Sequence, residues 1–234
     1  MSKSTTVRID LRRREFLQGV VSTAAAGAAV ETGLGLLSPR VTHAQTNLTP
    51  EGAFKELVEG NRRFSANQLT SIEHDLAMLK DKTVGKQEPF AAILSCADSR
   101  VPVELIFDQT IGHLFVVRVA GNIVTPEIIA SLEYGVAVLG IKALLVLGHA
   151  NCGAVKAAMK ADTVPGQISS LYQHLQPAVE QSGGDLQKAI EANASYQATL
   201  LKTASTVIKE AVKAGTVKIG AGVYDLGTGK VNLS

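Results

Sequence analysis

Two short stretches decide the fold, "ILSCADSR" at residues 93–100 and "LGHANCG" at residues 147–153. Each begins as an apolar run and ends in a polar turn, which is the pattern of a buried strand that leads into a loop. The two turns hold both cysteines of the 234-residue chain, Cys96 and Cys152. The sequence therefore places both thiols of the protein where two predicted strands end.

Apolar runs and helical patterns alternate along the rest of the chain. Strands are expected at residues 89–98, 113–121, 142–150, 217–226 and 230–234. Helical patterns are expected at residues 125–140, 152–161 and 167–214. Thr125 is the predicted cap of the helix at 125–140, and "SGGD" is a predicted break within 167–214. One helical turn is expected within 101–110. This alternation predicts an α/β fold with a mostly parallel central sheet and helices on both faces. The last two strands form a hairpin, which predicts an antiparallel edge strand.

An N-terminal helical arm precedes the first strand. Apolar residues recur at helical spacing between residues 50 and 69, and Thr49 before Pro50 is a typical helix start. A second short helix is expected at about residues 72–80. These helices precede the first strand and need a surface to pack on.

Residues 1–44 have the character of an export signal. The "RREFL" of Arg13–Leu17 resembles the twin-arginine signal, and a weakly apolar run follows at about residues 19–37. That run contains Glu31 and many small residues, so stable membrane insertion is not expected. The alternative is an amphipathic helix of the folded domain, but small residues all round the run make a poor packing face. The prediction is an exported, periplasmic protein that meets the twin-arginine export machinery in transit, with residues 45–234 as the folded domain.

The bulk composition limits the classes of function. The chain is 46% hydrophobic and 19% charged, which is typical of one globular domain. Its net charge is +2, and the leader carries six basic and three acidic residues, so the remainder has a net charge of −1. Without a basic excess to neutralise phosphates, no nucleic-acid partner is expected.

Four side chains at the two turns suggest a metal site. In parallel sheets, ligands bind beyond the carboxyl ends of the strands where the winding of the chain reverses. If the first and third strands are neighbours, four side chains converge there: Cys96, Asp98, His149 and Cys152. Two thiolates, one imidazole and one carboxylate suit tetrahedral zinc better than magnesium or calcium. A disulfide and a pair of buried structural cysteines are the alternatives, and the C-x-D-x-R and H-x-x-C patterns fit both poorly.

Asp98 has two possible roles. It can complete the metal site, or it can turn away and form a two-pronged ion pair with Arg100. In the second arrangement, water or hydroxide occupies the open position on zinc, which lowers the pKa of that water. The carboxylate then orients the water by accepting its proton in a hydrogen bond. A simple loop salt bridge is the alternative.

Three stretches together resemble the β-class carbonic anhydrases: "CADSRVPVE" at Cys96–Glu104, "RVAGNIV" at Arg118–Val124 and "GHANCGAVKAA" at Gly148–Ala158. The match in order and spacing runs from about Thr49 to the C-terminus. The chain departs from the family in having Val119 where asparagine is frequent, and it has no tryptophan for the bicarbonate-regulated pocket of some members.

The resemblance implies one zinc ion per chain held by Cys96, His149 and Cys152, with Asp98 either a ligand or paired to Arg100. It implies a lyase that reversibly hydrates carbon dioxide to bicarbonate and a proton, as a homodimer or homotetramer. The alternatives are a hydrolase of carbonyl sulfide or carbon disulfide on the same scaffold and a non-catalytic zinc protein. A further histidine outside the motifs, at position 113, is a candidate proton shuttle, with an ordinary loop histidine as the alternative.

Overall fold

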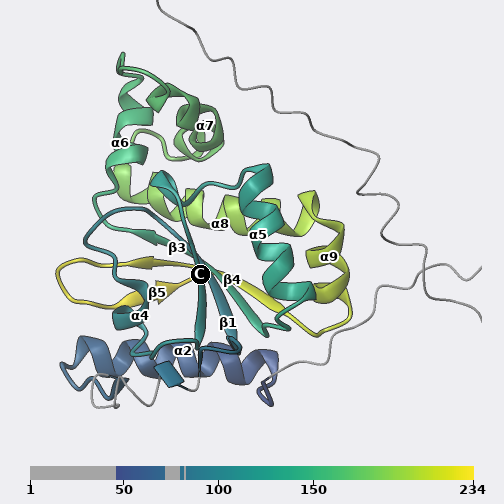
Figure 1. The fold of residues 1–234 in the computed structure, drawn as a ribbon. Coiled ribbons are helices and arrows are strands. Elements are labelled where there is room, and N and C mark those ends of the chain that lie inside the picture. Colours follow the sequence, from purple (N-terminus) through teal and green to yellow (C-terminus); the bar gives the residue numbers. More distant parts are fainter. Residues whose placement is uncertain (1–45, 72–79, 82) are drawn as a thin grey trace, which may run out of the picture. The chain divides into compact units, whose positions relative to one another are not determined.

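In the computed structural model, the described residues 46–71, 80–81 and 83–234 form an α/β fold around one five-stranded sheet (Figure 1). The strand order is β2-β1-β3-β4-β5. The first four strands are parallel and β5 pairs antiparallel with β4, as predicted. The strands are β1 (Ala91–Ser95), β2 (Leu114–Arg118), β3 (Ala143–His149), β4 (Lys218–Tyr224) and β5 (Val231–Leu233).

Helices cover both faces of the sheet, which confirms the second part of the fold prediction (Figure 1). On β1, Ala92 and Leu94 pack with one group of helices, and Ala91 and Ile93 pack with the other. Because successive side chains of a strand point to opposite faces, a strand covered on both sides is apolar throughout. The first group comprises α5 (Pro126–Ala137), α8 (Leu186–Ala204) and α9 (Thr206–Lys213), and the second comprises α2 (Pro50–Ser65) and α4 (Val103–Ile106).

The predicted helix starts are correct. Thr49 caps α2, because its hydroxyl oxygen accepts the N–H of Gly52 at 3.0 Å. Thr125 occupies the cap position of α5, but its hydroxyl donates to Glu127 at 2.9 Å instead of capping the backbone. The predicted second helix of the arm falls largely on residues 72–79, which lie outside the described residues, as does the leader.

The long helical region after β3 divides more often than the sequence predicts. α6 (Gly153–Lys160) matches the separate helix predicted at residues 152–161. The long region predicted from residue 167 contains η3 (Ile168–Leu171), α7 (Tyr172–Gln181), α8 and α9. The break at "SGGD" is confirmed, but continuity from there to residue 214 is wrong because Ser205 ends α8 and caps α9. Its hydroxyl accepts the N–H of Ile208 at 3.0 Å and donates to Glu133 at 2.6 Å. None of the helices in the described part of the chain is long and apolar enough to cross a membrane.

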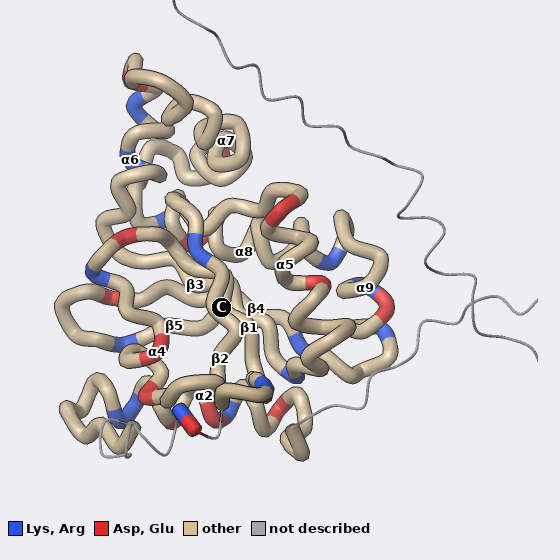
Figure 2. The backbone as a smooth tube through the Cα atoms, in the orientation of Figure 1, with Lys and Arg blue, Asp and Glu red and all other residues tan. Residues whose placement is uncertain are grey.

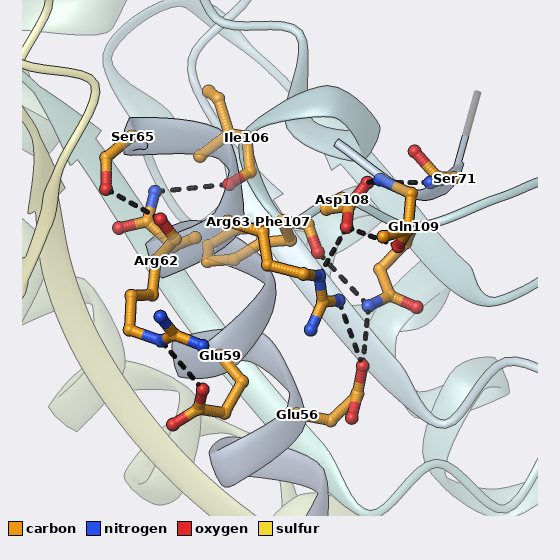
Figure 3. Close-up of polar contacts among 12 residues, drawn as sticks. Glu56, Glu59, Arg62, Arg63, Ser65, Ser71, Ile106, Phe107, Asp108 and Gln109 are labelled. Carbon is orange, nitrogen blue, oxygen red and sulfur yellow. Dashed lines mark hydrogen bonds and ion pairs between the residues drawn. The ribbon is translucent and has the colours of Figure 1, made fainter. Parts of the chain in front are cut away.

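A buried carboxylate fastens the N-terminal arm to the sheet domain (Figure 3). Asp108, which follows α4, is 4% exposed. Its carboxylate accepts the backbone N–H groups of Thr70 at 2.9 Å and Ser71 at 2.8 Å, and the guanidinium of Arg63 on α2. Burial alone would raise the pKa of Asp108, but the Arg63 and Ser71 hydrogen bonds hold that pKa well below its usual range. The ionised carboxylate therefore joins three separate segments.

The exposed side of α2 carries acidic and basic positions next to each other (Figure 2). Glu59 pairs with Arg62 at 2.9 Å, and Glu56 lies 3.5 Å from Arg63 (Figure 3). Solvent-exposed pairs of this kind add little to stability. The buried acceptor at Asp108 is accordingly a stronger polar anchor of the arm than these exposed pairs.

Replacing Asp108 by asparagine is expected to lower the free energy of unfolding by about 2 kcal/mol at pH 7, because charge-assisted hydrogen bonds are lost. A depressed pKa in the folded state gives stability that is complete above about pH 5 and is lost progressively as the pH falls further. The difference between wild type and Asp108→Asn should therefore shrink by about 1 kcal/mol at pH 3. Urea unfolding at both pH values measures this, with Glu59→Gln as an exposed control. An equal difference at both pH values would contradict the anchoring role of the charge.

Candidate metal centre

The site lies at the edge where the parallel strands end. β1 and β3 are hydrogen-bonded neighbours, with Ser95 opposite Leu147, as the site prediction requires. The chain continues from β1 to β2 on one side, whereas β3 and β4 lie on the other side of β1. This is the point at which the winding direction reverses, and loops that leave it frame a ligand site.

Three predicted ligand residues come together there. Cys96 follows β1, His149 is the last residue of β3, and Cys152 is the cap residue of α6. Their potential ligand atoms all lie within 4.8 Å of one another, and the three residues are 4% exposed or less. Both cysteines are free thiols, so the arrangement differs from the disulfide alternative.

The histidine is oriented for a ligand. Nδ1 of His149 lies 3.0 Å from the carbonyl oxygen of Ala150. A carbonyl only accepts, so Nδ1 carries the proton and Nε2 presents a lone pair. Nε2 of His149 is buried and has no hydrogen-bond partner among the described residues. An imidazole nitrogen left unpaired beside two sulfur atoms fits a metal ion, which supplies the missing partner.

The two sulfur atoms influence each other. The adjacent Cys152 thiol lowers the pKa of Cys96, and the same pairing raises the pKa of Cys152. The backbone N–H of Gly121 also donates to Sγ of Cys96 at 3.3 Å, which favours the charged form of that sulfur. Cys96 is therefore poised as a thiolate, the form that binds metals.

Asp98 is held away from the cluster by Arg100. Nε and Nη2 of Arg100 donate to the two carboxylate oxygens at 2.9 and 2.8 Å, and the backbone N–H of Arg100 donates at 2.9 Å. These hydrogen bonds keep the pKa of Asp98 below its usual range, so the carboxylate is ionised. One of its oxygens lies 3.8 Å from Nε2 of His149. This ion pair is the contact that the second of the two predicted arrangements requires.

Two supporting groups were not predicted. Arg118, at the end of β2, donates through Nε to the carbonyl oxygen of Cys96 at 2.9 Å and through Nη2 to that of Asp98. The second is the N–H of Gly121, in the 3-10 turn η2 (Ala120–Asn122). Both belong to the quoted "RVAGNIV" stretch, which was the available signal. They hold the loop after β1, and with it the cysteine and the aspartate.

The candidate shuttle histidine lies elsewhere. His113 precedes β2, and its carbonyl oxygen accepts the N–H of Phe90, which precedes β1. It is thus at the amino ends of the strands, a strand length of about 16 Å from the edge that carries Cys96. Within one chain His113 does not reach the metal centre.

Comparison with known proteins decides the family. The sequence model of the family described as carbonic anhydrase matches residues 91–231. The chain belongs to the carbonic anhydrase family. It is 34% identical over 199 residues to carbonic anhydrase 2 of Mycobacterium tuberculosis, covering 80% of this chain and 94% of that protein. A carbonic anhydrase of Mycolicibacterium smegmatis is 34% identical over 195 residues, with the same shares covered.

Solved structures place this family member in the β-class fold. The β-carbonic anhydrase CcaA superposes with a TM-score of 0.63 at 26% identity, covering 77% of this chain and 94% of that chain. The Coccomyxa β-carbonic anhydrase, solved with acetazolamide, gives a TM-score of 0.61 at 29% identity, covering 76% and 84%. The protein is thus an enzyme of the carbonic anhydrase family, and the resemblance drawn from the motifs is confirmed for family and fold.

Proposed function

We propose that this enzyme binds zinc and catalyses the reversible hydration of carbon dioxide, in which water and carbon dioxide give bicarbonate and a proton. The observation that carries the proposal is the buried set of two cysteines and one histidine with an unpaired Nε2. Membership of the carbonic anhydrase family and relatives that bear that name support the reaction. The predicted ion is one zinc per chain.

Cys96, His149 and Cys152 are the residues that would hold the zinc ion. Two thiolates and a neutral imidazole are a common zinc donor set, and a catalytic site leaves one further position open. When bound, zinc supplies a Lewis acid that lowers the pKa of a water molecule and makes it a nucleophile near neutral pH. Burial of all three donors excludes competing water from the sulfur atoms.

The chain's own polar groups prepare the water for reaction. Arg100 keeps Asp98 ionised and fixes the orientation of the carboxylate by donating one hydrogen bond to each oxygen. A carboxylate oxygen has a second lone pair, which remains able to accept a hydrogen bond from the reacting water. Arg118 fixes the carbonyl groups of the same loop, so the carboxylate stays beside His149. Asp98 therefore orients the water, and Arg100 is its positioning residue.

The test is stopped-flow carbon dioxide hydration with zinc quantified in every sample, from about pH 6.5 to 9, where the rate should rise with pH. Asp98→Ala is expected to lower kcat by about 100-fold, because a group that orients the proton is lost. Arg100→Ala is expected to lower it by about 10-fold, because the carboxylate loses its support. Arg62→Ala, which removes an exposed arginine on α2, is the control. Full activity in Arg100→Ala would remove this account of the pair.

The same experiment separates the alternatives. Wild-type protein that contains one zinc ion but hydrates no carbon dioxide at any pH would support the three zinc ligands and contradict the proposed reaction. Turnover of carbonyl sulfide or carbon disulfide by that sample would then identify the hydrolase. Inactivity toward all three molecules would identify a structural zinc site.

We propose that the protein is a homodimer that pairs through the edge of the sheet opposite to β5. Strand β2 forms this edge, and most of its side chains are half-buried within the single chain. Beside it, the ring of Phe115 lies 6.3 Å from that of Tyr134 on α5, and Tyr134 and Val138 are 46% and 43% exposed. An open strand edge flanked by exposed apolar side chains favours association. Pairing of two dimers would give the tetramer.

Replacing Tyr134 by glutamate should weaken this dimer, because a charge would be buried against apolar surface. Size-exclusion chromatography with light scattering should then show a monomer at concentrations where the wild type is a dimer. Val207→Glu, at another exposed apolar position on α9, should leave the dimer intact. A dimer that persists unchanged in Tyr134→Glu would argue for a different interface.

We infer that residues 1–44 direct the protein to the periplasm through the twin-arginine route. The support is the "RREFL" stretch at Arg13–Leu17 and the weakly apolar run that follows. Such a route carries folded protein, so zinc can bind before export and shield the two thiolates from oxidation.

Changing Arg13 and Arg14 together to lysine should retain the protein in the cytoplasm, because the paired arginines are the recognised feature of the signal. Cell fractionation followed by immunoblotting measures this, with the Arg12→Lys variant as a neighbouring control. Periplasmic protein that carries a Cys96–Cys152 disulfide and no zinc would contradict loading before export.

A further inference from the structure

We propose that Asn193 and Gln197 on α8 are positioning residues of the metal centre. They hold the loop at residues 121–124, whose first N–H donates to the sulfur of Cys96. This inference rests on the proposed function, because it takes Cys96 as a zinc ligand. It assigns a role to two buried amides that no step of the hydration reaction uses.

The two amides bind the two ends of the loop. Nδ2 of Asn193 donates to the carbonyl oxygen of Gly121 at 2.9 Å. The N–H of Val124 donates to Oε1 of Gln197, also at 2.9 Å. Asn193 and Gln197 are 1% and 0% exposed, so neither amide has water as a substitute partner. The two successive peptide groups that meet at Gly121 are thereby both held, one by the bond of its carbonyl oxygen to α8 and the other by the bond of its N–H to Cys96.

The direction of every hydrogen bond in this network is determined. The N–H of Val124 can only donate, so the atom of Gln197 that faces it is the oxygen. The nitrogen of Gln197 then faces the carbonyl oxygen of His174 at 2.9 Å and Oδ1 of Asn193 at 3.1 Å. The nitrogen of Asn193 is left to face Gly121. A chain of donors with one consistent orientation specifies the loop more strictly than apolar packing does.

The loop itself needs this support. Gly121 has a φ of +76° and Asn122 a φ of +44°, so two successive residues adopt the left-handed conformation. Neighbours surround the turn closely, since a Cβ at Gly121 would lie 3.2 Å from Leu175 and 3.3 Å from Ala154. Side chains cannot occupy the inner side of the turn. Its backbone groups are therefore held by partners that reach in from α8.

The consequence for the metal centre is that the N–H of Gly121 stays directed at Sγ of Cys96. Hydrogen bonds to a ligating atom orient it and adjust how strongly it donates to the metal. If Asn193 no longer holds the Gly121 carbonyl, the φ and ψ angles of Gly121 are less restrained, and its N–H can turn away from Sγ of Cys96. Changes in such outer partners typically alter metal affinity or activity by about 10- to 100-fold.

The test compares metal release from full-length wild type, Asn193→Ala and Gln197→Met. Zinc transfer to a chromophoric chelator gives the release rate, and the cobalt-substituted protein gives the sulfur-to-metal charge-transfer band. We expect release to be about 10-fold faster in both variants and the band to shift, because the hydrogen bond to sulfur is lost. Because Gln197→Met keeps the side-chain length, its release rate and cobalt band still test the inference if Asn193→Ala does not fold.

Leu201→Ala is the matched control, because Leu201 is a fully buried residue of the same helix that packs in the apolar core. It should lower thermal stability as much as Asn193→Ala while leaving the release rate and the cobalt band unchanged. Wild-type release and an unshifted band in the amide variants would overturn the inference, as would equally fast release from Leu201→Ala. Wild-type protein that binds no metal would overturn the proposed function as well, so the two failures are distinct.

Discussion

The parallel pairing of β1 with β3 is the constraint on which the metal centre depends. Because Ser95 lies opposite Leu147, Cys96 one residue later and His149 two residues later emerge at the same edge of the sheet. Both strands are fully buried, and a shift of pairing by one residue would turn every side chain to the opposite face. The packing of the two apolar cores therefore determines the direction in which the ligand side chains point.

The same edge contains buried polar atoms that lack hydrogen-bond partners among the described residues. Two thiols and the Nε2 of His149 are taken out of water without a hydrogen-bonding partner for that nitrogen among the described residues. Such an arrangement is unfavourable by itself, and a metal ion reverses it by accepting all three donors. Arg100 has the opposite effect on Asp98, since it satisfies the carboxylate within the chain and keeps it charged. The site thus combines donors that need an ion with a carboxylate that does not.

The residues that carry chemistry were predictable from the sequence, whereas the groups that support them were not. The apolar run that ends in Cys96 predicts both a buried strand and a metal ligand at the end of that strand. The N–H of Gly121 has no such signature, because every residue except proline has one. Arg118 supports the site through strand register, and Ser205 divides a helix through a contact with another helix, so neither role is local. His113 carries suitable chemistry but lies at the wrong ends of the strands, which composition and motif do not reveal.

Polar residues in the middle of a helix that faces an apolar core need a reason. Asn193 and Gln197 occupy successive turns of α8 among buried alanine and leucine residues, where apolar side chains of similar volume would pack without desolvation. Buried amides are tolerated only if all their hydrogen bonds are made. In this structure the side-chain oxygen and nitrogen of both residues are hydrogen-bonded. The groups they bind belong to a loop that cannot be held by side chains of its own. The two amides of α8 therefore orient the loop beside Cys96. The apolar residues on the rest of the buried face of the helix stabilise its packing and offset the cost of burying these amides.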